Sequence, residues 1–343
     1  MESAKAKAGA PPEGPQAIMN MFQAAQSTAV LCSAIELNVF AQLADGPRDT
    51  AAVARGIRCP ERSARILLDA LVTLGLLGKD RAAYRLTSIA EAHLVPGKPM
   101  YMGDFAGLVG SQTLWEGLGR LSDAVRTGGT VLEEHAETPK HPFWETFAKS
   151  SGSLAFPAAG TLAGLLHDWI ASKPRVRALD IAAGSGIYGY TLLRSNANVE
   201  LTVLDWPNVL VETRKWAERL GVDKSRVKYI EGNLFEADYR GPYDLVLLSH
   251  VYHHFDPPTC RGLTRKIAGA LEPGGRVAVH DFLAGDDNPG AAMFSVMMLV
   301  WTWKGEAYSA GDYRAWFVES GLKPIGEYSS APMPTSFLIA EKA

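Results

Sequence analysis

The sequence has little cysteine, no strong excess of charge and no long apolar run, and each absence excludes a class of protein. Its 343 residues include three scattered cysteines, Cys32, Cys59 and Cys260, with no C-x-x-C pair. Neither a disulfide framework nor a zinc ribbon is therefore expected. The net charge of −3, from 34 basic and 37 acidic residues, argues against a nucleic-acid partner. The most apolar run, Ala291–Trp303, falls short of the roughly 20 residues that span a bilayer, so we expect a buried helix there and no membrane partner.

The N-terminus also lacks the apolar core of a signal peptide. Residues 1–15 contain small, charged and proline residues, which predicts a disordered tail. With few cysteines and no targeting segment, a cytoplasmic location is expected. The chain is too long for one ordinary core, which predicts two domains.

Residues 16–98 have the pattern of a mainly α winged-helix domain. Apolar residues recur at helical spacing over 16–43, and no charged residue lies between Gln16 and Ser33. A helix with so few charged faces usually packs against another chain. Two helical patterns, 49–56 and 60–77, are followed by a turn and a strand, the order of a winged helix-turn-helix. Beyond Arg62 and Arg65 the second helix offers few groups for reading DNA, so we expect dimerisation.

Residues 99–172 are predicted to be a helical linker that also contributes to a substrate pocket. Aromatic residues and methionines are frequent there, and most are expected to pack in the core at helical spacing. The segment His141–Gly152 is the part predicted to form a pocket wall. Its candidate residues are Phe143, Trp144 and Phe147.

From residue 173 to 343 apolar strands alternate with amphipathic helices, which predicts a doubly wound α/β sheet. The last two expected strands are joined by a link too short for a crossover helix, so they should form an antiparallel hairpin. Helices are expected to begin near Gly186, Asn208 and Pro257. The expected strands are Val176–Ile181, Glu200–Asp205, Val227–Glu231, Tyr243–Ser249, Arg276–Asp281, Pro324–Tyr328 and Thr335–Ala340.

A glycine-rich turn follows the first of these strands. Residues 184–189 match G-x-G-x-x-G, and Asp205 lies about 20 residues further on, which alone would suit a nicotinamide dinucleotide. However, Asp180 places a negative charge where a pyrophosphate would pass. A ligand with an ammonium group at one end and a ribose at the other fits Asp180 and Asp205 better. That ligand is S-adenosylmethionine, with the small residues after Asp180 admitting its methionine portion.

An ordered set of motifs resembles one family over nearly the whole chain after the tail. They are LDIAAGSG, VLDWPNVL, GNLF, YDLVLLSHVYHHFD, LEPGGRVAVHDFL and GDYRAWFVESGL. This set resembles the S-adenosylmethionine-dependent O-methyltransferases with an N-terminal winged-helix dimerisation domain. The resemblance implies a class I methyltransferase sheet whose last strand is antiparallel, and a homodimer. It also implies methyl transfer to a hydroxyl of a small aromatic or polyketide-like secondary metabolite.

The resemblance also assigns roles to residues. His253 matches the family's catalytic histidine, a side chain able to take a phenol proton near neutral pH, and Asp281 matches the acidic residue that orients it. The expected cofactor-binding residues are Asp180, Ala182, Gly184, Gly186, Asp205, Trp206, Asn233, Leu234 and Ser249. The expected substrate-binding residues are Phe143, Trp144, Phe147, His254, Met298 and Trp301.

The sequence departs from the family pattern at several of these positions. The aspartate that follows the family's histidine is His254 here, and its adenine-site aspartate and lysine are Asn233 and Ser249. Two glycines of the first motif are Ala182 and Ala183, and a second acidic residue, near Glu306, is out of register by one.

No metal is expected, because His250 and His253 on one strand would point to opposite faces. Four other functions remain open. They are methyl transfer to carbon or nitrogen, a non-methylating reaction on the same fold, a regulator that senses S-adenosylmethionine, and a nicotinamide enzyme.

Overall fold

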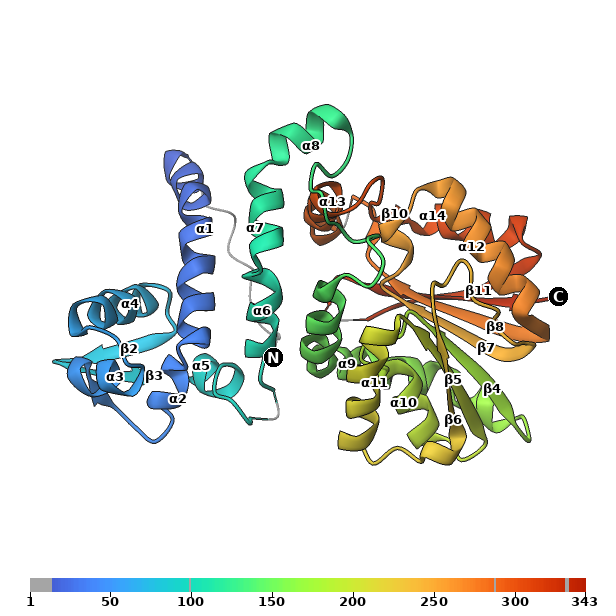
Figure 1. Cartoon of the computed structure of the whole chain (residues 1–343), viewed down its shortest axis with the longest axis horizontal. Coiled ribbons are helices and arrows are strands. Elements are labelled where there is room, and N and C mark those ends of the chain that lie inside the picture. The colour runs from blue at the N-terminus through green and yellow to red at the C-terminus, as the bar shows by residue number, and fades with distance from the viewer. Residues whose placement is uncertain (1–13, 99, 287, 331–332) are drawn as a thin grey trace, which may run out of the picture. The chain divides into compact units, whose positions relative to one another are not determined.

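The computed structural model describes residues 14–98, 100–286, 288–330 and 333–343, and the chain divides into two compact units after Gly110 (Figure 1). The predicted tail, 1–15, lies almost wholly outside these residues. Within them, no helix has both the length and the apolar character of a membrane span.

The first unit has the expected winged-helix order. Helix α1 (Pro15–Glu36) is separated from α2 (Val39–Gln42) by Leu37 and by Asn38, whose φ is 58°. Helices α3 (Thr50–Gly56) and α4 (Glu61–Thr73) precede a hairpin of β2 (Leu77–Asp80) and β3 (Ala83–Leu86), and β1 (Arg48–Asp49) pairs with β3. The unit continues through α5 (Ser88–His93), η1 (Gly103–Phe105) and α6 (Ala106–Val109).

One helix boundary in this unit was predicted wrongly. Helix α4 ends at Thr73 and not at Leu77. Gly75 takes a left-handed φ of 72°, which ends the helix and turns the chain. The buried Leu77 therefore begins strand β2.

The second unit is built on a seven-stranded sheet in the order β11-β12-β8-β7-β4-β5-β6. Strand β12 pairs antiparallel with both β11 and β8, so the antiparallel hairpin and the class I methyltransferase sheet are confirmed. The central strands pair in parallel, which places their carboxyl ends at one edge. The strands are β4 (Val176–Ile181), β5 (Val199–Asp205), β6 (Val227–Glu231), β7 (Tyr243–Ser249), β8 (Leu271–Asp281), β11 (Leu322–Ser329) and β12 (Ser336–Lys342).

Helices cover both faces of this sheet (Figure 1). Buried residues of α9 (Pro142–Ala171), α10 (Ile187–Ser195) and α11 (Pro207–Arg219) form one core with the sheet. Those of α12 (Pro257–Ala270) and α14 (Ala310–Glu319) form the other. The remaining elements of the unit are α7 (Gln112–Gly119), α8 (Leu121–Thr127), η2 (Lys224–Arg226), η3 (Tyr252–His254), β9 (Leu283–Ala284), α13 (Pro289–Trp301) and β10 (Tyr308–Ser309).

Helix α13 is only partly the buried helix that its composition predicts. It packs against α7 and α8, and Met298 and Trp301 are buried. Met293 on the same helix is 72% exposed. Because the helix is apolar on most sides but packed on one, its composition overestimates its burial.

Candidate functional site

The glycine turn lies at the carboxyl end of two adjacent parallel strands. Strand β4 ends at Ile181 and β5 ends at Asp205, and the chain turns after β4 through three left-handed residues. These are Ala182, Gly184 and Gly186, with φ of 52°, 56° and 76°. A Cβ added at Gly184 would meet nothing within 4 Å, so the backbone there faces open space. This geometry leaves room for a ligand against the main chain.

Two buried carboxylates stand at this turn. Asp205 accepts hydrogen bonds from the backbone N–H groups of Gly184, at 2.8 Å, and Trp206, at 2.7 Å. Asp180 accepts one from Gly189, at 3.1 Å. Burial raises the pKa of Asp180 to about 7 and that of Asp205 to about 6. No Lys, Arg or His of the described chain forms an ion pair with either, so the protein supplies no cation to these two carboxylates.

Gly189, the third glycine of the motif, packs directly against Asp180. A Cβ at Gly189 would lie 2.8 Å from Oδ2 of Asp180 and 2.9 Å from the Leu201 side chain. Only glycine lets helix α10 approach the strands this closely while its N–H reaches the carboxylate.

The other expected cofactor residues lie at the same edge of the sheet. Trp206 is the N-cap residue of α11, directly after β5. Asn233 follows β6, and its Oδ1 accepts the N–H of Phe235 at 2.9 Å, which shapes the turn beside the half-buried Leu234. Ser249 is the last residue of β7. The structure thus brings all nine expected residues to the carboxyl ends of β4, β5, β6 and β7.

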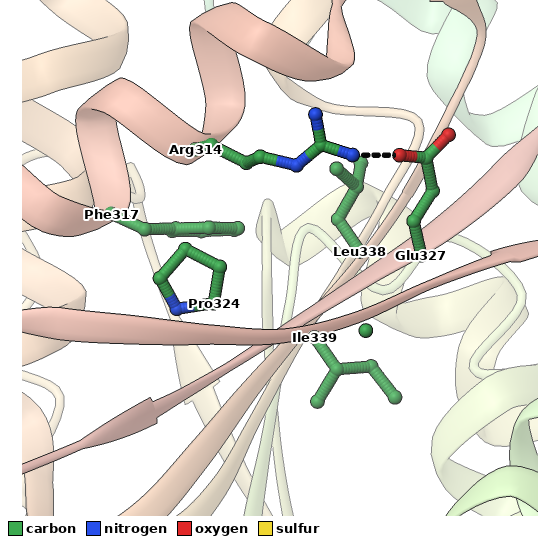
Figure 2. A pocket seen from close by; sticks show the side chains of 7 residues that line it. Arg314, Phe317, Pro324, Glu327, Leu338 and Ile339 are labelled. Carbon is green, nitrogen blue, oxygen red and sulfur yellow. Dashed lines mark hydrogen bonds and ion pairs between the residues drawn. The ribbon is translucent and has the colours of Figure 1, made fainter.

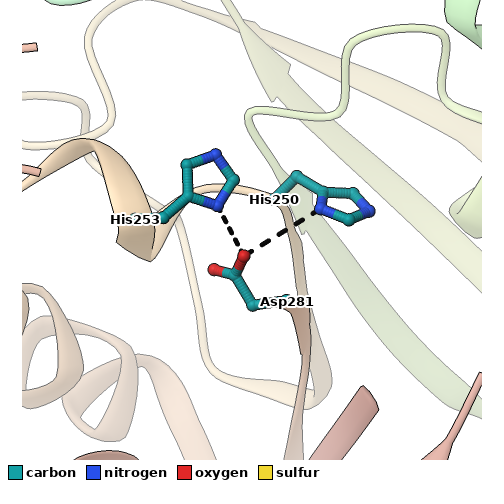
Figure 3. A group of neighbouring side chains, drawn as sticks. All are labelled: His250, His253 and Asp281. Carbon is teal, nitrogen blue, oxygen red and sulfur yellow. Dashed lines mark hydrogen bonds and ion pairs between the residues drawn. The ribbon is translucent and has the colours of Figure 1, made fainter. Parts of the chain in front are cut away.

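A histidine and an aspartate meet at the neighbouring strand ends. His253 lies on η3, just after β7, and its Nδ1 is 2.5 Å from Oδ1 of Asp281, the last residue of β8 (Figure 3). The Phe282 N–H and the Tyr313 hydroxyl also donate to Asp281, each at 2.9 Å. Burial alone would raise the pKa of Asp281, but the charge and hydrogen bond of His253, with His250 and Tyr313, hold it at about 2. Asp281 is therefore an ionised partner for the imidazole.

His250 lies in the same group, contrary to the expectation that it and His253 face opposite sides. Strand β7 stops at Ser249, and His250 takes a left-handed φ of 60°, so strand alternation no longer applies. Its Nδ1 is 3.9 Å from Oδ1 of Asp281, and one ligand atom from each of His250, His253 and Asp281 lies within 4.8 Å of the others (Figure 3). Burial lowers the pKa of His250 to about 4, so its ring is neutral at pH 7.

The expected substrate residues form a continuous aromatic group beside His253. Phe143 and Trp144 of α9 lie 5.1 Å apart between ring centroids, and Phe143 lies 4.9 Å from Trp301 of α13. The ring centroid of Trp144 lies 5.2 Å from that of His254. Phe147 stacks with Phe143, and Met298 packs in the same cluster. These side chains form an apolar wall.

Sequence reasoning missed two residues of this region. The ring of Phe294, on α13, lies 4.6 Å from that of His253 and 3.9 Å from that of Phe282. Tyr313 of α14 holds Asp281. The apolar run that contains Phe294 and the motif that contains Tyr313 were both visible in the sequence, but neither shows which residue faces Asp281 or His253.

Glu306 has no contact with this group. It is exposed, and within the described chain its side chain makes no hydrogen bond or ion pair. Its neighbour Gly305 lies against the main chain of the histidine segment, where an added Cβ would overlap the carbonyl oxygen of His253. The loop therefore packs against His253 through backbone.

Comparison with known proteins identifies the chain. Residues 159–323 match the O-methyltransferase domain, and residues 19–96 match the O-methyltransferase dimerisation domain. The chain is 30% identical over 333 residues to 3-hydroxy-5-methyl-1-naphthoate 3-O-methyltransferase of Streptomyces sahachiroi, with 92% of each chain covered. It belongs to the S-adenosylmethionine-dependent O-methyltransferase family.

Solved structures agree with this assignment. A crystal structure from Nostoc punctiforme, assigned to the O-methyltransferases, has a TM-score of 0.90 and 34% identity, covering 96% of this chain and 100% of that one. PigF of Serratia, solved with S-adenosylhomocysteine, has a TM-score of 0.84 and 26% identity, with 96% and 100% covered. The methyltransferase activity and the cofactor implied by the sequence motifs are thus confirmed.

The edge at β4 and β5 fits S-adenosylmethionine. The backbone at Gly184 faces open space, and Asp180 and Asp205 are buried without a cation to compensate them. A ligand that carries an ammonium group and a sulfonium supplies the missing positive charge. The residues present are therefore consistent with the cofactor of the family.

The enzyme has a further small hollow, on the face of β11 and β12 toward α14. Its volume is about 160 Å³, and an Arg314–Glu327 ion pair crosses it (Figure 2). None of the expected site residues lines it, and Phe317 and Pro324 close it from one side.

Proposed function

We propose that the enzyme transfers the methyl group of S-adenosylmethionine to a hydroxyl of a small aromatic or polyketide-like metabolite, with His253 as the general base. When bound, the cofactor supplies a methyl group activated on a sulfonium. The observation that carries the proposal is the 2.5 Å contact between Nδ1 of His253 and the buried, ionised Asp281.

This contact determines which nitrogen of His253 is available. Asp281 only accepts, so Nδ1 of His253 carries a proton, and in the neutral ring Nε2 keeps its lone pair. Figure 3 shows Nε2 on the side of the ring away from Asp281. A hydroxyl placed at Nε2 would give up its proton as the oxygen becomes nucleophilic, and the imidazolium formed would be stabilised by the charge of Asp281. Asp281 acts as a positioning residue.

The cofactor-binding roles are proposed from the strand-end geometry. Asp180 fixes the ammonium-bearing end, and the small residues Ala182, Gly184 and Gly186 admit the methionine portion. Asp205 has lone pairs left beyond its two backbone donors and accepts from the ribose. Trp206, Asn233, Leu234 and Ser249 surround the adenine end.

The acceptor class is proposed from the aromatic wall and from the named relative. The Streptomyces sahachiroi enzyme is named for a hydroxylated naphthoate. A flat aromatic acceptor suits contact with aromatic side chains next to His253. The proposed contact residues are Phe143, Trp144, Phe147, His254, Met298 and Trp301.

Substituting His253 tests the proposed base. We expect His253→Ala to lower kcat by about 10² to 10⁴ while calorimetry shows unchanged affinity for S-adenosylhomocysteine. The matched control is His167→Ala, at an exposed position of α9. Retained turnover in His253→Ala would reject His253 as base, and product analysis by mass spectrometry would show whether oxygen, carbon or nitrogen is methylated.

We also propose that residues 16–98 form the dimerisation domain of a homodimer, followed by the linker and pocket region 99–172 and the catalytic domain 173–343. The support is the exposed apolar side of α1, where Met21 and Phe22 are each 73% exposed. Sedimentation should show a dimer, and Met21→Glu with Phe22→Glu should shift it toward monomer. A wild-type monomer at micromolar concentration would contradict this.

A further inference from the structure

Helix α11 contacts both the glycine turn and the helix that carries the aromatic wall. It begins two residues after Asp205, the last residue of β5. Its Thr213 hydroxyl donates to the carbonyl oxygen of Gly184 at 2.6 Å, so the helix is bonded to the turn itself. Elsewhere along its length α11 packs against α9. The members of the wall that α9 contributes are Phe143, Trp144 and Phe147.

Three hydrogen bonds join α11 to the first part of α9. Nδ2 of Asn208 donates to the carbonyl oxygen of Lys140 at 3.2 Å and to Oε1 of Glu145 at 2.8 Å. The indole N–H of Trp216 donates to the carbonyl oxygen of Ala148 at 2.9 Å. The two partners of Asn208 lie just before and just after the first two aromatic residues of the wall in the sequence. Asn208 therefore holds the segment of α9 that presents them.

The two parts of α9 are held unequally. In the part before Pro157 the buried residues are Ala148 and Gly152, whereas the part after it contributes a row of side chains to the core of the sheet. Residues 150–153, Ser-Ser-Gly-Ser, are poor helix formers, and Pro157 cannot donate to the carbonyl oxygen four residues earlier. The first part is thus the less stable one, and its order depends on contacts with neighbouring elements.

We propose that Asn208 is a positioning residue that makes the order of the first part of α9 depend on the bound cofactor, so that the aromatic wall is completed after S-adenosylmethionine binds. This inference rests on the proposed positions of cofactor and acceptor. Asp180 and Asp205 have no cation from the protein, so a ligand that supplies one stabilises the glycine turn. Because Thr213 and Asn208 belong to one helix, a ligand that fixes the turn also favours the helix position at which Asn208 reaches α9.

Hydrogen–deuterium exchange with S-adenosylhomocysteine tests this proposal without an acceptor. Exchange is followed by mass spectrometry in two peptides of the full enzyme, one over residues 181–190 and one over residues 141–152. In the wild type the ligand should slow exchange in both, and in the second by at least about fivefold. The first peptide reports the position of the cofactor, and the second reports its coupling to α9.

The variants separate the hydrogen bonds of Asn208 from other effects. In Asn208→Ala the ligand should still slow exchange at 181–190, but its effect at 141–152 should fall toward onefold. Glu145→Gln keeps an oxygen that accepts from Nδ2 of Asn208 and should retain the wild-type effect. The matched control is Lys215→Ala, which removes an exposed side chain of α11 that bonds to Glu212 of the same helix, and it should behave like the wild type.

Two results would overturn the inference. They are unchanged exchange at 141–152 when the ligand binds the wild type, and an undiminished effect in Asn208→Ala. If Asn208→Ala fails to fold, Trp216→Phe provides the second variant, because it removes the indole donor and keeps an aromatic ring beside Gly152. It should also weaken the effect at 141–152, and an undiminished effect would overturn the inference.

The two peptides distinguish failure of the coupling from failure of the proposed cofactor site. Slower exchange at 181–190 without a change at 141–152 would reject the coupling and leave the cofactor site intact. Unchanged exchange at 181–190 in enzyme saturated with S-adenosylhomocysteine would reject the proposed cofactor position, and the coupling with it.

Discussion

Asp180 and Asp281 are both buried carboxylates at the carboxyl ends of strands in one sheet, yet their pKa values move in opposite directions. That of Asp180 rises to about 7, and that of Asp281 falls to about 2. Asp180 has one backbone N–H as its partner. Asp281 has a backbone N–H, a tyrosine hydroxyl and the imidazole of His253. Burial alone favours the neutral acid, and partners reverse that preference.

The difference separates two kinds of site. The charge on Asp281 is stabilised by the protein itself, so this carboxylate can orient His253 before any ligand arrives. The ionised form of Asp180 lacks such stabilisation until a cation binds beside it. Substitutions on the two sides, and the pH dependence of stability, should therefore have different effects on kcat and on the free energy of unfolding.

Asp281→Asn should have the largest effect. The amide would donate to Nδ1 of His253, so the proton would move to Nε2 and the ring could no longer accept from the acceptor. We expect kcat to fall by about 10² to 10⁴, with the affinity for S-adenosylhomocysteine unchanged in calorimetry. The exposed Asp168→Asn is the control. Wild-type kcat in Asp281→Asn would show that this pair is structural only.

Gly305→Ala should disturb the His253 side without touching Asp180. The new Cβ would overlap the carbonyl oxygen of His253 and lie 2.7 Å from the carbonyl carbon of His254. We expect a loss of about 1–3 kcal/mol in the free energy of unfolding and a kcat lowered more than about tenfold. Urea denaturation and initial rates measure both.

Gly269→Ala is its matched control. Gly269 is exposed on α12, and a Cβ there meets nothing within 4 Å, so the helix should become slightly more stable. Equal stability and equal kcat in Gly305→Ala and Gly269→Ala would show that the backbone contact at Gly305 does not position His253.

The pH dependence of the free energy of unfolding should show the titration of Asp180. Its folded pKa lies above the unfolded value, so the folded enzyme without ligand binds more protons, and stability falls as pH rises from about 4 to about 7. Between pH 5 and 7 the free energy of unfolding should drop by roughly 2–3 kcal/mol, with Asp205 adding to the effect up to pH 6. Asp281 acts only in strong acid, where its stabilisation is lost as pH falls through about 2.

Asp180→Asn provides the control for this profile. The amide oxygen can still accept the Gly189 N–H, so the variant should fold with a flatter profile between pH 5 and 7. S-adenosylhomocysteine should bind the wild type more tightly as pH rises through this range, because its ammonium pairs with the ionised acid. A wild-type profile that matches Asp180→Asn would contradict the proposed ammonium site.

Ala182→Gly should have the smallest effect. Ala182 has a left-handed φ of 52°, which costs an L-residue about 1–2 kcal/mol, partly offset in glycine by lost chain entropy. A gain of at most about 1 kcal/mol is expected in urea denaturation. Ala183 is not left-handed, so Ala183→Gly should destabilise instead. An equal loss of unfolding free energy in Ala182→Gly and Ala183→Gly would argue against backbone strain at Ala182.

The two parts of the site differ in how far the sequence predicted them. Asp180, the glycine turn and Asp205 lie within 26 residues of chain, on strands whose apolar runs are plain, so their meeting follows from parallel pairing. The position of His250 was misjudged because strand alternation was applied beyond Ser249, where β7 has already ended. The partner Tyr313 and the ring of Phe294 come from helices α14 and α13, and sequence periodicity gives neither helix a direction in space.

The sequence by itself determined the order of strands and helices along the chain, the turn for the cofactor and the identity of the His253–Asp281 pair, because local patterns and ordered motifs encode them. Only the tertiary structure decided the protonation states of the buried carboxyl groups. Asp180, Asp205 and Asp281 are the same side chain in sequence, and the number of donors that packing brings to each sets whether it is ionised. The same holds for His254, because folding leaves its buried Nδ1 without a hydrogen-bond partner among the described residues.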